Sequence, residues 1–175
     1  MKEAIKRNGI MFGIILGMFS ILIRTIIYIV NLELITSFML GISIMVANLI
    51  IFTILLLRTK KEMNGNITFK EAFTTFIIAA FIGTTLAVSF DILLFNVIDP
   101  AAKETIKELS IKSTVSMLQK FDTPQAKINE TIKSMTESDT FSVGKQLLGL
   151  FVSYIISSII GLIFAAFFKT KTVNY

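Results

Sequence analysis

The sequence predicts an all-α integral membrane protein: a bundle of four membrane-spanning helices, with an extramembrane helical hairpin between spans 3 and 4. Composition is the first reason, because 54% of the residues are apolar and 17% are charged, whereas soluble domains have about 45–50% and about 25%. The clustering of the charges is the second reason, since it leaves four windows with the roughly 20 apolar residues that a bilayer-crossing helix needs. The length of 175 residues suits a single membrane domain.

The first span is predicted over residues 9–30, after a basic start at Lys2, Lys6 and Arg7. A basic start followed by an apolar run also begins a secretory signal peptide. This run is longer than the roughly 7–15 apolar residues of such a peptide and lacks a small-x-small cleavage site. It also carries Arg24 near its end. We therefore expect the first helix to be retained as a span.

The second span is predicted over residues 35–57, after a tight connection at residues 31–34. A charged loop follows it, and Asn64-Gly65 is a turn signal within that loop. The third span is predicted over residues 72–98. This is longer than a bilayer requires, so we expect its first turn to lie at the interface or the helix to be tilted.

Three helix starts are marked by capping residues. Thr68 and Glu71 form a capping-box pattern at the start of the third span. Asp99-Pro100 and Thr123-Pro124 each place a capping side chain directly before a proline, which is favoured at the first position of a helix. We expect each of these pairs to begin a helix.

The segment 99–141 is polar, with six Lys and seven acidic residues. It predicts two amphipathic helices, over about 100–119 and about 124–136, outside the membrane. Their apolar residues are Ile106, Leu109, Ile111, Val115, Leu118 and Phe121 in the first helix, and Ile128, Ile132 and Met135 in the second.

The fourth span is predicted over residues 143–168. Lys and Arg residues near span ends favour the cytoplasmic side. They gather in the N-terminal tail, the loop between spans 2 and 3, and the C-terminal tail, so we expect both termini to be cytoplasmic and residues 99–141 to be extracytoplasmic. The basic residues are Lys2, Lys6, Arg7, Arg58, Lys60, Lys61, Lys70, Lys169 and Lys171.

Three spans carry small residues at four-residue spacing, a pattern that lets helices approach closely within lipid. Small residues are common in membrane helices, so one stripe can arise by chance. Three stripes in one chain favour a compact bundle, and whether one of them faces a second copy is left open. The helix-packing residues are Gly9, Gly13 and Gly17, then Ala79, Gly83 and Ala87, then Gly149, Ser153, Ser157, Gly161 and Ala165.

Arg24 and Asp91 are charged residues well inside predicted spans. A charge there costs about 2.5–3.5 kcal/mol on insertion scales and usually faces protein or water. Arg24 follows Gly17 by two helical turns and Asp91 follows Ala87 by one, so each lies on the small-residue face of its span. Their distances from the span starts place both in the outer part of the membrane. We therefore predict a candidate intramembrane charge pair.

Other arrangements of Arg24 and Asp91 stay open. They could share a polar pocket with Asn48, Asn96 or Glu33, or each could extend separately to the outer headgroups. A structural salt bridge that locks span 1 to span 3 explains the same two residues as well as a functional role does.

Nothing in the sequence points to catalysis. The chain has no His and no Cys, which removes the commonest general base, a thiolate nucleophile and the commonest transition-metal ligands. No nucleotide-binding, metalloprotease or hydrolase motif occurs. We therefore predict no enzyme activity, no cofactor and no metal site. The basic residues flank the spans, so the net charge of +5 predicts contact with the lipid bilayer and not with nucleic acid.

Three pieces of the sequence carry a resemblance to a known family. They are Asn8-Gly9 with Gly13 and Gly17, the segment Ile67–Phe73, and the segment Asn96–Pro100. On these pieces the chain resembles domain of unknown function 4199, a group of small four-span membrane proteins found mainly in Bacteroidetes. The likeness covers nearly the whole chain. It implies a bacterial inner-membrane location and supplies no activity, ligand or catalytic residue.

Two functions fit the sequence. The first is a non-enzymatic, structural or partner-binding inner-membrane protein, whose external helices meet a membrane-protein partner, a lipid surface or another copy of the chain. The alternative is a small transporter or proton-linked carrier that uses Arg24 and Asp91, alone or as a homodimer. No proline interrupts a span, which is unlike the broken helices of many transporters. A water-filled cavity that reaches Asp91 favours transport, whereas a dry contact favours a scaffold.

Overall fold

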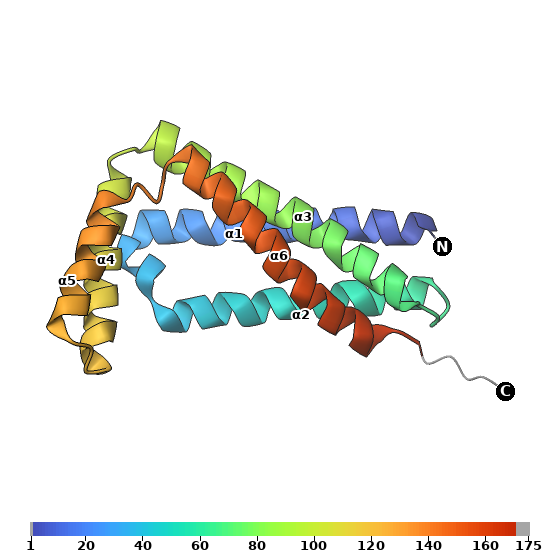
Figure 1. Ribbon diagram of the computed structural model, residues 1–175. Helices are drawn as coiled ribbons and strands as arrows, with labels where there is room; N and C mark the ends of the chain where they lie inside the picture. The colour runs from blue at the N-terminus through green and yellow to red at the C-terminus, as the bar shows by residue number, and fades with distance from the viewer. Residues whose placement is uncertain (1, 171–175) are drawn as a thin grey trace.

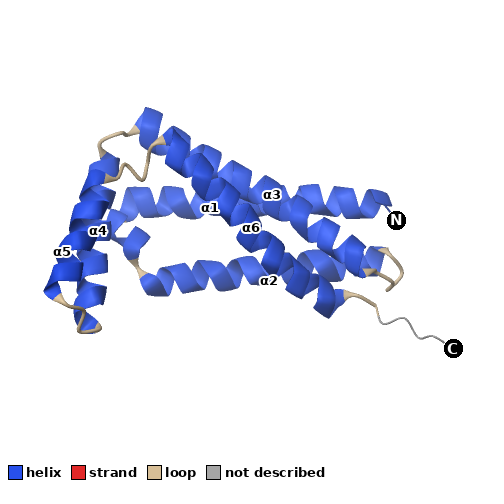
Figure 2. Cartoon of the chain, viewed as in Figure 1, coloured by secondary structure: helices blue, strands red, loops and turns tan. Residues whose placement is uncertain are grey.

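The structure, a computed structural model that describes residues 2–170, consists of helices joined by short connections, and no strand occurs in this part of the chain (Figure 1, Figure 2). Four helices are long and apolar enough to cross a membrane. The predicted all-α bundle with an inserted hairpin is therefore confirmed. The helices are α1 Lys2–Val30, α2 Phe38–Glu62, α3 Phe69–Leu93, α4 Ala102–Lys120, α5 Gln125–Glu137 and α6 Val143–Phe168.

The two ends of the bundle differ in charge. One end holds the start of α1, the turn between α2 and α3, and the end of α6, and we call it the basic end (Figure 1). Helices α4 and α5 lie across the opposite end, which we call the hairpin end. The basic residues described at the basic end are Lys2, Lys6, Arg7, Arg58, Lys60, Lys61, Lys70 and Lys169.

Helices α1 and α3 run parallel and form the centre of the bundle. Each glycine of the α1 stripe faces an α3 residue 69 positions further along the chain, so the two helices keep one register. A Cβ added at any of these glycines would overlap the facing side chain, which explains the need for glycine. The distances from the added Cβ to the facing Cβ are 2.9 Å for Gly9 and Ile78, 2.8 Å for Gly13 and Ile82, and 2.7 Å for Gly17 and Leu86.

The small residues of α3 face α1 from the other side of the same interface. An added Cβ at Gly83 would lie 2.9 Å from the Cβ of Leu16. Ala79 is fully buried. Ala87 lies further along α3 and borders two hollows described below. The first two residues of this stripe therefore pack against α1.

The small-residue stripe of α6 packs along only part of its length. An added Cβ at Gly161 would lie 2.8 Å from the ring of Phe76 on α3, and Ala165 is fully buried. At Gly149 an added Cβ would meet no atom within 4 Å. Ser153, one turn later, donates to the carbonyl of Gly149 within its own helix. Within the described residues, the Gly149 end of this stripe therefore leaves room for another helix.

The second span begins at Phe38, slightly later than residue 35, because a 3-10 helix intervenes. This helix, η1, covers Leu32–Thr36. The side chain of Asn31 accepts a hydrogen bond from the amide of Glu33, and Ser37 caps α2 by accepting from the amide of Leu40. The connection from α1 is therefore longer than the predicted residues 31–34.

The two ends of the third span are closed by different hydrogen-bond patterns. Thr68 and Glu71 form the predicted capping box at the start of α3. At its other end, α3 continues into a π-helix, η2, over Leu94–Ile98. The amide of Asp99 donates to the carbonyl of Leu94 at 2.8 Å. The predicted span 72–98 does not anticipate this wider turn, which rotates Asp99 relative to the α-helix before it.

The turn between α2 and α3 contains the predicted Asn64-Gly65 signal. Both residues have positive φ angles, 56° and 79°, in the left-handed region that glycine and asparagine tolerate best. The charged residues before this turn continue α2 as far as Glu62. Arg58 and Glu62 are therefore helical neighbours one turn apart, and the loop itself is short.

The hairpin differs in detail from its prediction. Helix α4 begins at Ala102, although Asp99 accepts a hydrogen bond from the amide of Ala102 at 3.2 Å. Thr123 does not cap α5, which begins at Gln125 without a side-chain cap. Ile106 and Ile128 are buried, with 1% and 2% of their surface exposed. One residue of each apolar stripe is therefore fully buried, whereas Phe121 at the end of the first stripe is 76% exposed.

At the basic end, a polar network joins α1 to α2 through the carboxylate of Glu62. The guanidinium groups of Arg7 and Arg58 donate to it at 2.8 and 3.2 Å, and the side-chain amide of Asn8 donates to it at 3.0 Å. The Asn8 amide also donates to the hydroxyl of Thr59 at 3.3 Å, and both of these side chains are buried. Three donors on one carboxylate hold these helix ends together.

The same end joins α2 and the α2–α3 turn to the end of α6. Lys60 donates to the carbonyl of Phe168 at 3.1 Å. The hydroxyl of Thr170 accepts from the amide of Ile67 at 2.9 Å and donates to the carbonyl of Gly65 at 3.0 Å. The basic end is therefore closed by hydrogen bonds among α1, α2, α6 and the turn.

Candidate functional site

Arg24 of α1 and Asp91 of α3 form a two-point ion pair inside the bundle. The Nε atom of Arg24 lies 2.9 Å from Oδ1 of Asp91, and its Nη2 atom donates to Oδ2 at 3.1 Å. The two side chains are 33% and 23% exposed. This fork matches the planar guanidinium to the planar carboxylate, which is the geometry that arginine supplies and lysine does not.

The register of α1 and α3 places these two charges together. Leu16 meets Gly83 in the same interface, and Arg24 and Asp91 each lie eight residues further along their helices. Eight residues correspond to about 12 Å of helix, or slightly more than two turns. Because the helices are parallel and keep their register over this distance, the ion pair is a continuation of the small-residue interface.

A second pair lies closer to the hairpin end. The hydroxyl of Tyr28, one turn beyond Arg24, donates to Oδ2 of Asp99 at 2.8 Å. The other carboxylate oxygen of Asp99 accepts from the amide of Ala102, where α4 starts. Asp99 therefore links α1, the end of the third span and the hairpin.

The sequence prediction missed the contact between Tyr28 and Asp99. Tyr28 follows Arg24 by four residues and so lies on the charged face of α1, whereas the π-helix η2 between Asp91 and Asp99 rotates Asp99 out of the α-helical register of α3. The sequence predicts only a helix-capping role for Asp99. That role uses one carboxylate oxygen and leaves the other for Tyr28.

The polar residues suggested as companions of the charge pair do not join it. The amide of Asn48 donates to the carbonyl of Ile44 within α2 at 3.0 Å. Asn96 donates within its own helix and accepts from the ammonium of Lys103 at 3.3 Å. Glu33 lies in η1 and borders a hollow with α4 residues. Within residues 2–170 no hydrogen bond joins these three residues to the charge pair, and Arg24 contacts Asp91 directly.

A cleft separates α2 from the layer formed by α1, α3 and α6. It consists of three hollows of about 270, 270 and 330 Å³, and each shares lining residues with the other two. We call it the α2 cleft and define it by these shared residues. They are Ser20, Gly41, Ile44, Asn48, Phe52, Ala87 and Ser157.

Arg24 lies at the hairpin-end part of the α2 cleft, and aromatic rings close the opposite part. The hollow beside Arg24 is also lined by Ser20 and Ala87, whereas Asp91 does not line any of the three hollows. Towards the basic end, the ring of Phe52 stacks on Phe76 with centroids 4.0 Å apart. The cleft thus reaches one member of the ion pair and ends on an aromatic layer.

The chemistry of the α2 cleft suits binding. Arg24 brings a charge that is already neutralised by Asp91, and elsewhere in the cleft the hydroxyl and amide groups belong to the short side chains of Ser20, Asn48 and Ser157. Small residues such as Gly41 and Ala87 leave room for another backbone to approach. The α2 cleft is therefore suited to binding an apolar or weakly polar ligand or helix.

Comparison with known proteins bears on this arrangement. Residues 11–170 match the family described as "Protein of unknown function (DUF4199)". The chain belongs to the DUF4199 family. The DUF4199 match includes Arg24, Asp91, the hairpin and all of α2, α3 and α6. Of the pieces that carried the resemblance, Asn8-Gly9 lies just before the matched region, and the others lie within it.

No curated protein and no solved structure matches this DUF4199 chain significantly. The description of the family names no activity, substrate or partner. The functional argument therefore depends on the geometry of this chain.

Proposed function

We propose that the chain is a non-enzymatic, multi-pass protein of the bacterial inner membrane that binds a membrane-protein partner or a second copy of itself. The observation that carries this proposal is the α2 cleft between α2 and the other spans, in which small and polar side chains lie among large apolar ones. The absence of His and Cys from the sequence supports a non-catalytic role. Neither a cofactor nor nucleic acid is part of the proposal.

The packing of the spans favours a helix as the occupant. In their most apolar windows, α2 and α6 bury only 11% and 6% of their residues, against 28% for α1. Gly41 on α2 and Gly149 on α6 have no atom within 4 Å of an added Cβ. Exposed small residues let a partner helix approach closely, which is the main attraction between helices in lipid.

The charges favour one orientation. The basic end is cytoplasmic in this proposal, with both chain termini on that side and residues 99–141 extracytoplasmic. Alkaline phosphatase fused at residue 120 is then expected to be active, and a cytoplasmic reporter at the same position inactive. The opposite pattern would overturn the orientation and leave the partner proposal standing.

A photo-crosslinking residue at Met45 tests the partner directly. Met45 borders the α2 cleft and is 55% exposed. Leu22 on α1 is the matched control, because it is 57% exposed and lies a similar number of residues from the hairpin end. We expect a protein crosslink of defined mass at Met45, a weaker or absent one at Leu22, and loss of the Met45 product in the variant Gly41→Leu.

Equal crosslinking at Met45 and Leu22, or products with lipid alone, would contradict the proposal. So would a monomer that purifies without any partner in mild detergent after crosslinking. Gly41→Leu is a fair perturbation of the cleft because an added Cβ there meets no atom within 4 Å beyond its own helix turn.

One observation favours transport as a second candidate: the α2 cleft reaches Arg24. A small transporter or proton-linked carrier using Arg24 and Asp91, alone or as a homodimer, needs water in that cleft. The chain has no native cysteine, so Ser20→Cys gives a single thiol within the cleft. Rapid reaction with a membrane-impermeant thiol reagent would favour transport, whereas a thiol that does not react would favour a helix partner.

A further inference from the structure

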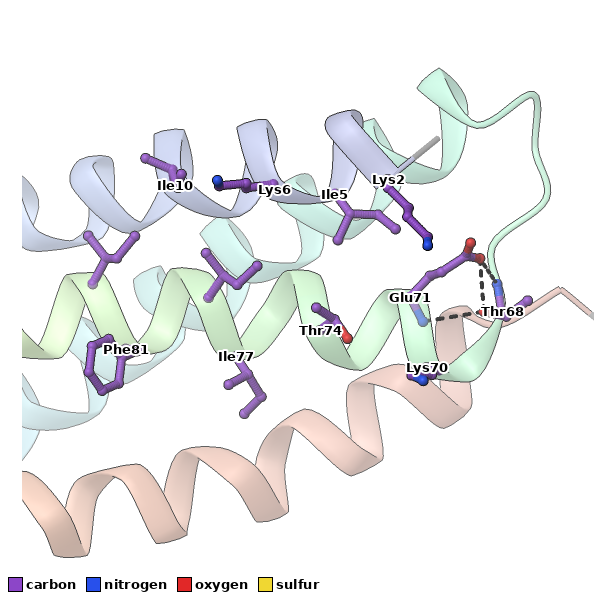
Figure 3. Close-up of a pocket in the computed structure, with 12 residues that line it drawn as sticks. Lys2, Ile5, Lys6, Ile10, Thr68, Lys70, Glu71, Thr74, Ile77 and Phe81 are labelled. Carbon is purple, nitrogen blue, oxygen red and sulfur yellow. Dashed lines mark hydrogen bonds between the residues drawn. The ribbon is translucent and has the colours of Figure 1, made fainter.

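A second groove, larger than any single hollow of the α2 cleft, lies between α1 and α3 at the basic end. Its volume is about 800 Å³, within the roughly 300–1,000 Å³ typical of ligand sites. None of its lining residues lines the three hollows of the α2 cleft, so it is a separate feature. Figure 3 shows the residues of α1 and α3 that line it.

The mouth of this groove is basic. Lys2 and Lys6 from α1 and Lys70 from α3 line it, and all three are exposed. Within residues 2–170 no ion pair or hydrogen bond engages their ammonium groups, unlike Arg7, Arg58 and Lys60 at the same end.

One acidic residue lies at the mouth, and its carboxylate is already engaged. Glu71 accepts hydrogen bonds from the amide and the hydroxyl of Thr68 in the capping box, as Figure 3 shows. Three lysines against one engaged carboxylate leave the mouth with a net charge of +2. This net positive charge favours an anionic group of a ligand at the mouth.

The groove becomes apolar with depth. Ile10 lines it from α1, and Ile77 and Phe81 line it from α3 (Figure 3). From Glu71 to Ile82 the groove follows α3 for about 16 Å, which is close to half of the roughly 30 Å hydrocarbon thickness. The basic mouth matches the phosphate headgroup of a phospholipid, and the apolar part of the groove, which is about as long as one leaflet is thick, matches its acyl chain.

We propose that this groove binds one anionic phospholipid, with its phosphate at Lys2, Lys6 and Lys70 and an acyl chain along Ile77 and Phe81. A second copy of the chain is a poorer occupant, because a symmetric contact would bring two basic mouths together. A zwitterionic lipid is also poorer, since its headgroup adds an ammonium beside three others. The site does not depend on the partner proposed for the α2 cleft.

The test measures lipid binding to the purified full-length chain by native mass spectrometry, with phosphatidylglycerol and phosphatidylcholine added in parallel. We expect preferential retention of phosphatidylglycerol. Juxtamembrane lysines typically contribute enough that each removal weakens anionic-lipid binding about fivefold, so Lys6→Gln and Lys70→Gln should each reduce the retained fraction. The matched control is Lys61→Gln, because Lys61 is an exposed lysine at the same end that does not line the groove.

A second variant tests the site independently of the net charge of the protein, which the lysine substitutions also change. The substitution Ile77→Trp fills the apolar part of the groove without altering the charge of the protein, and it should displace phosphatidylglycerol. The helix content measured by circular dichroism should stay unchanged. Glycerol phosphate, which has a headgroup but no acyl chain, should not compete. Equal retention of both lipids, equal loss in Lys61→Gln, an unaffected Ile77→Trp variant, or full competition by glycerol phosphate would each overturn the site.

Discussion

At the scale of single residues, Arg24 and Asp91 each carry a charge that a membrane helix would not keep without a partner. Their two-point contact, at 2.9 and 3.1 Å, supplies that partner. Both side chains remain partly exposed to the α2 cleft or to lipid. The free energy of the pair is therefore smaller than that of a fully buried one, and its main effect is to fix α1 against α3.

We expect Asp91→Asn to destabilise the bundle by about 1–2 kcal/mol, below the roughly 3–5 kcal/mol for a fully buried pair, because it leaves the Arg24 charge unpaired. The exchange of both residues, Arg24→Asp with Asp91→Arg, should recover at least half of the loss. Unfolding of the purified chain in increasing sodium dodecyl sulphate measures both. No recovery in the double variant, together with equal losses in both single variants, would show that the contact does not contribute to stability.

Tyr28 gives a separate prediction about the hairpin. Tyr28→Phe removes the hydroxyl that donates to Asp99 and leaves the ring in place. A hydrogen bond to a charged group contributes more to stability than one between neutral groups, so amide exchange at the start of α4 should accelerate roughly tenfold. Hydrogen–deuterium exchange read by mass spectrometry checks this, with α5 as the internal comparison. Unchanged exchange at Ala102 and Lys103 would show that Asp99 holds the hairpin without Tyr28.

The ion pair could be predicted from sequence because four-residue spacing puts charges and small residues on one face of a helix. The pairing of Tyr28 with Asp99 could not, since it depends on the π-helix at Leu94–Ile98. A π-turn leaves no clear residue signature and shifts the face of each residue after it. The groove at the basic end was also missed, because its lining alternates between two helices that are distant in sequence.

At the scale of elements, the glycine stripe of α1 sets the distance to α3. Gly13→Leu would force the Ile82 side chain and the Ala79 carbonyl away, since an added Cβ lies 2.8 and 3.0 Å from them. We expect a loss of about 2–3 kcal/mol in the same detergent titration, at the upper range of overpacking. Gly149→Leu is the matched control, because nothing lies within 4 Å of its added Cβ. Equal losses in the two variants would mean that helix propensity and not packing governs the effect.

Span positions and helix caps were predictable where the signal is local. Long apolar windows predicted the four helices, and Thr68 with Glu71 predicted the start of α3. The predicted start of the second span, residue 35, is slightly too early. Ile35 is apolar and resembles a residue of the span, although it lies in η1. Hydropathy cannot separate a 3-10 turn from the helix after it, whereas Ser37 as a cap can.

At the scale of the whole molecule, the two ends of the bundle are held differently. The basic end is closed by Glu62, Lys60 and Thr170, which join α1, α2, α6 and the α2–α3 turn. Towards the hairpin end, α2 diverges from α6 and the α2 cleft lies between them, while α4 and α5 cover the ends of α1 and α3 (Figure 1). This asymmetry predicts that α2 moves about its basic end.

Pairs of spin labels test this motion, since the chain has no native cysteine to remove. Labels at Met45→Cys and Phe151→Cys report on α2 and α6 beside the cleft, and labels at Lys61→Cys and Lys169→Cys report on the basic end. We expect a broad distance distribution for the first pair and a narrow one for the second, because hydrogen bonds restrain only the second. Addition of a partner found by crosslinking at Met45 should narrow the first distribution alone. Two equally narrow distributions without a partner would mean that α2 is fixed along its whole length and that the cleft is a rigid, preformed site.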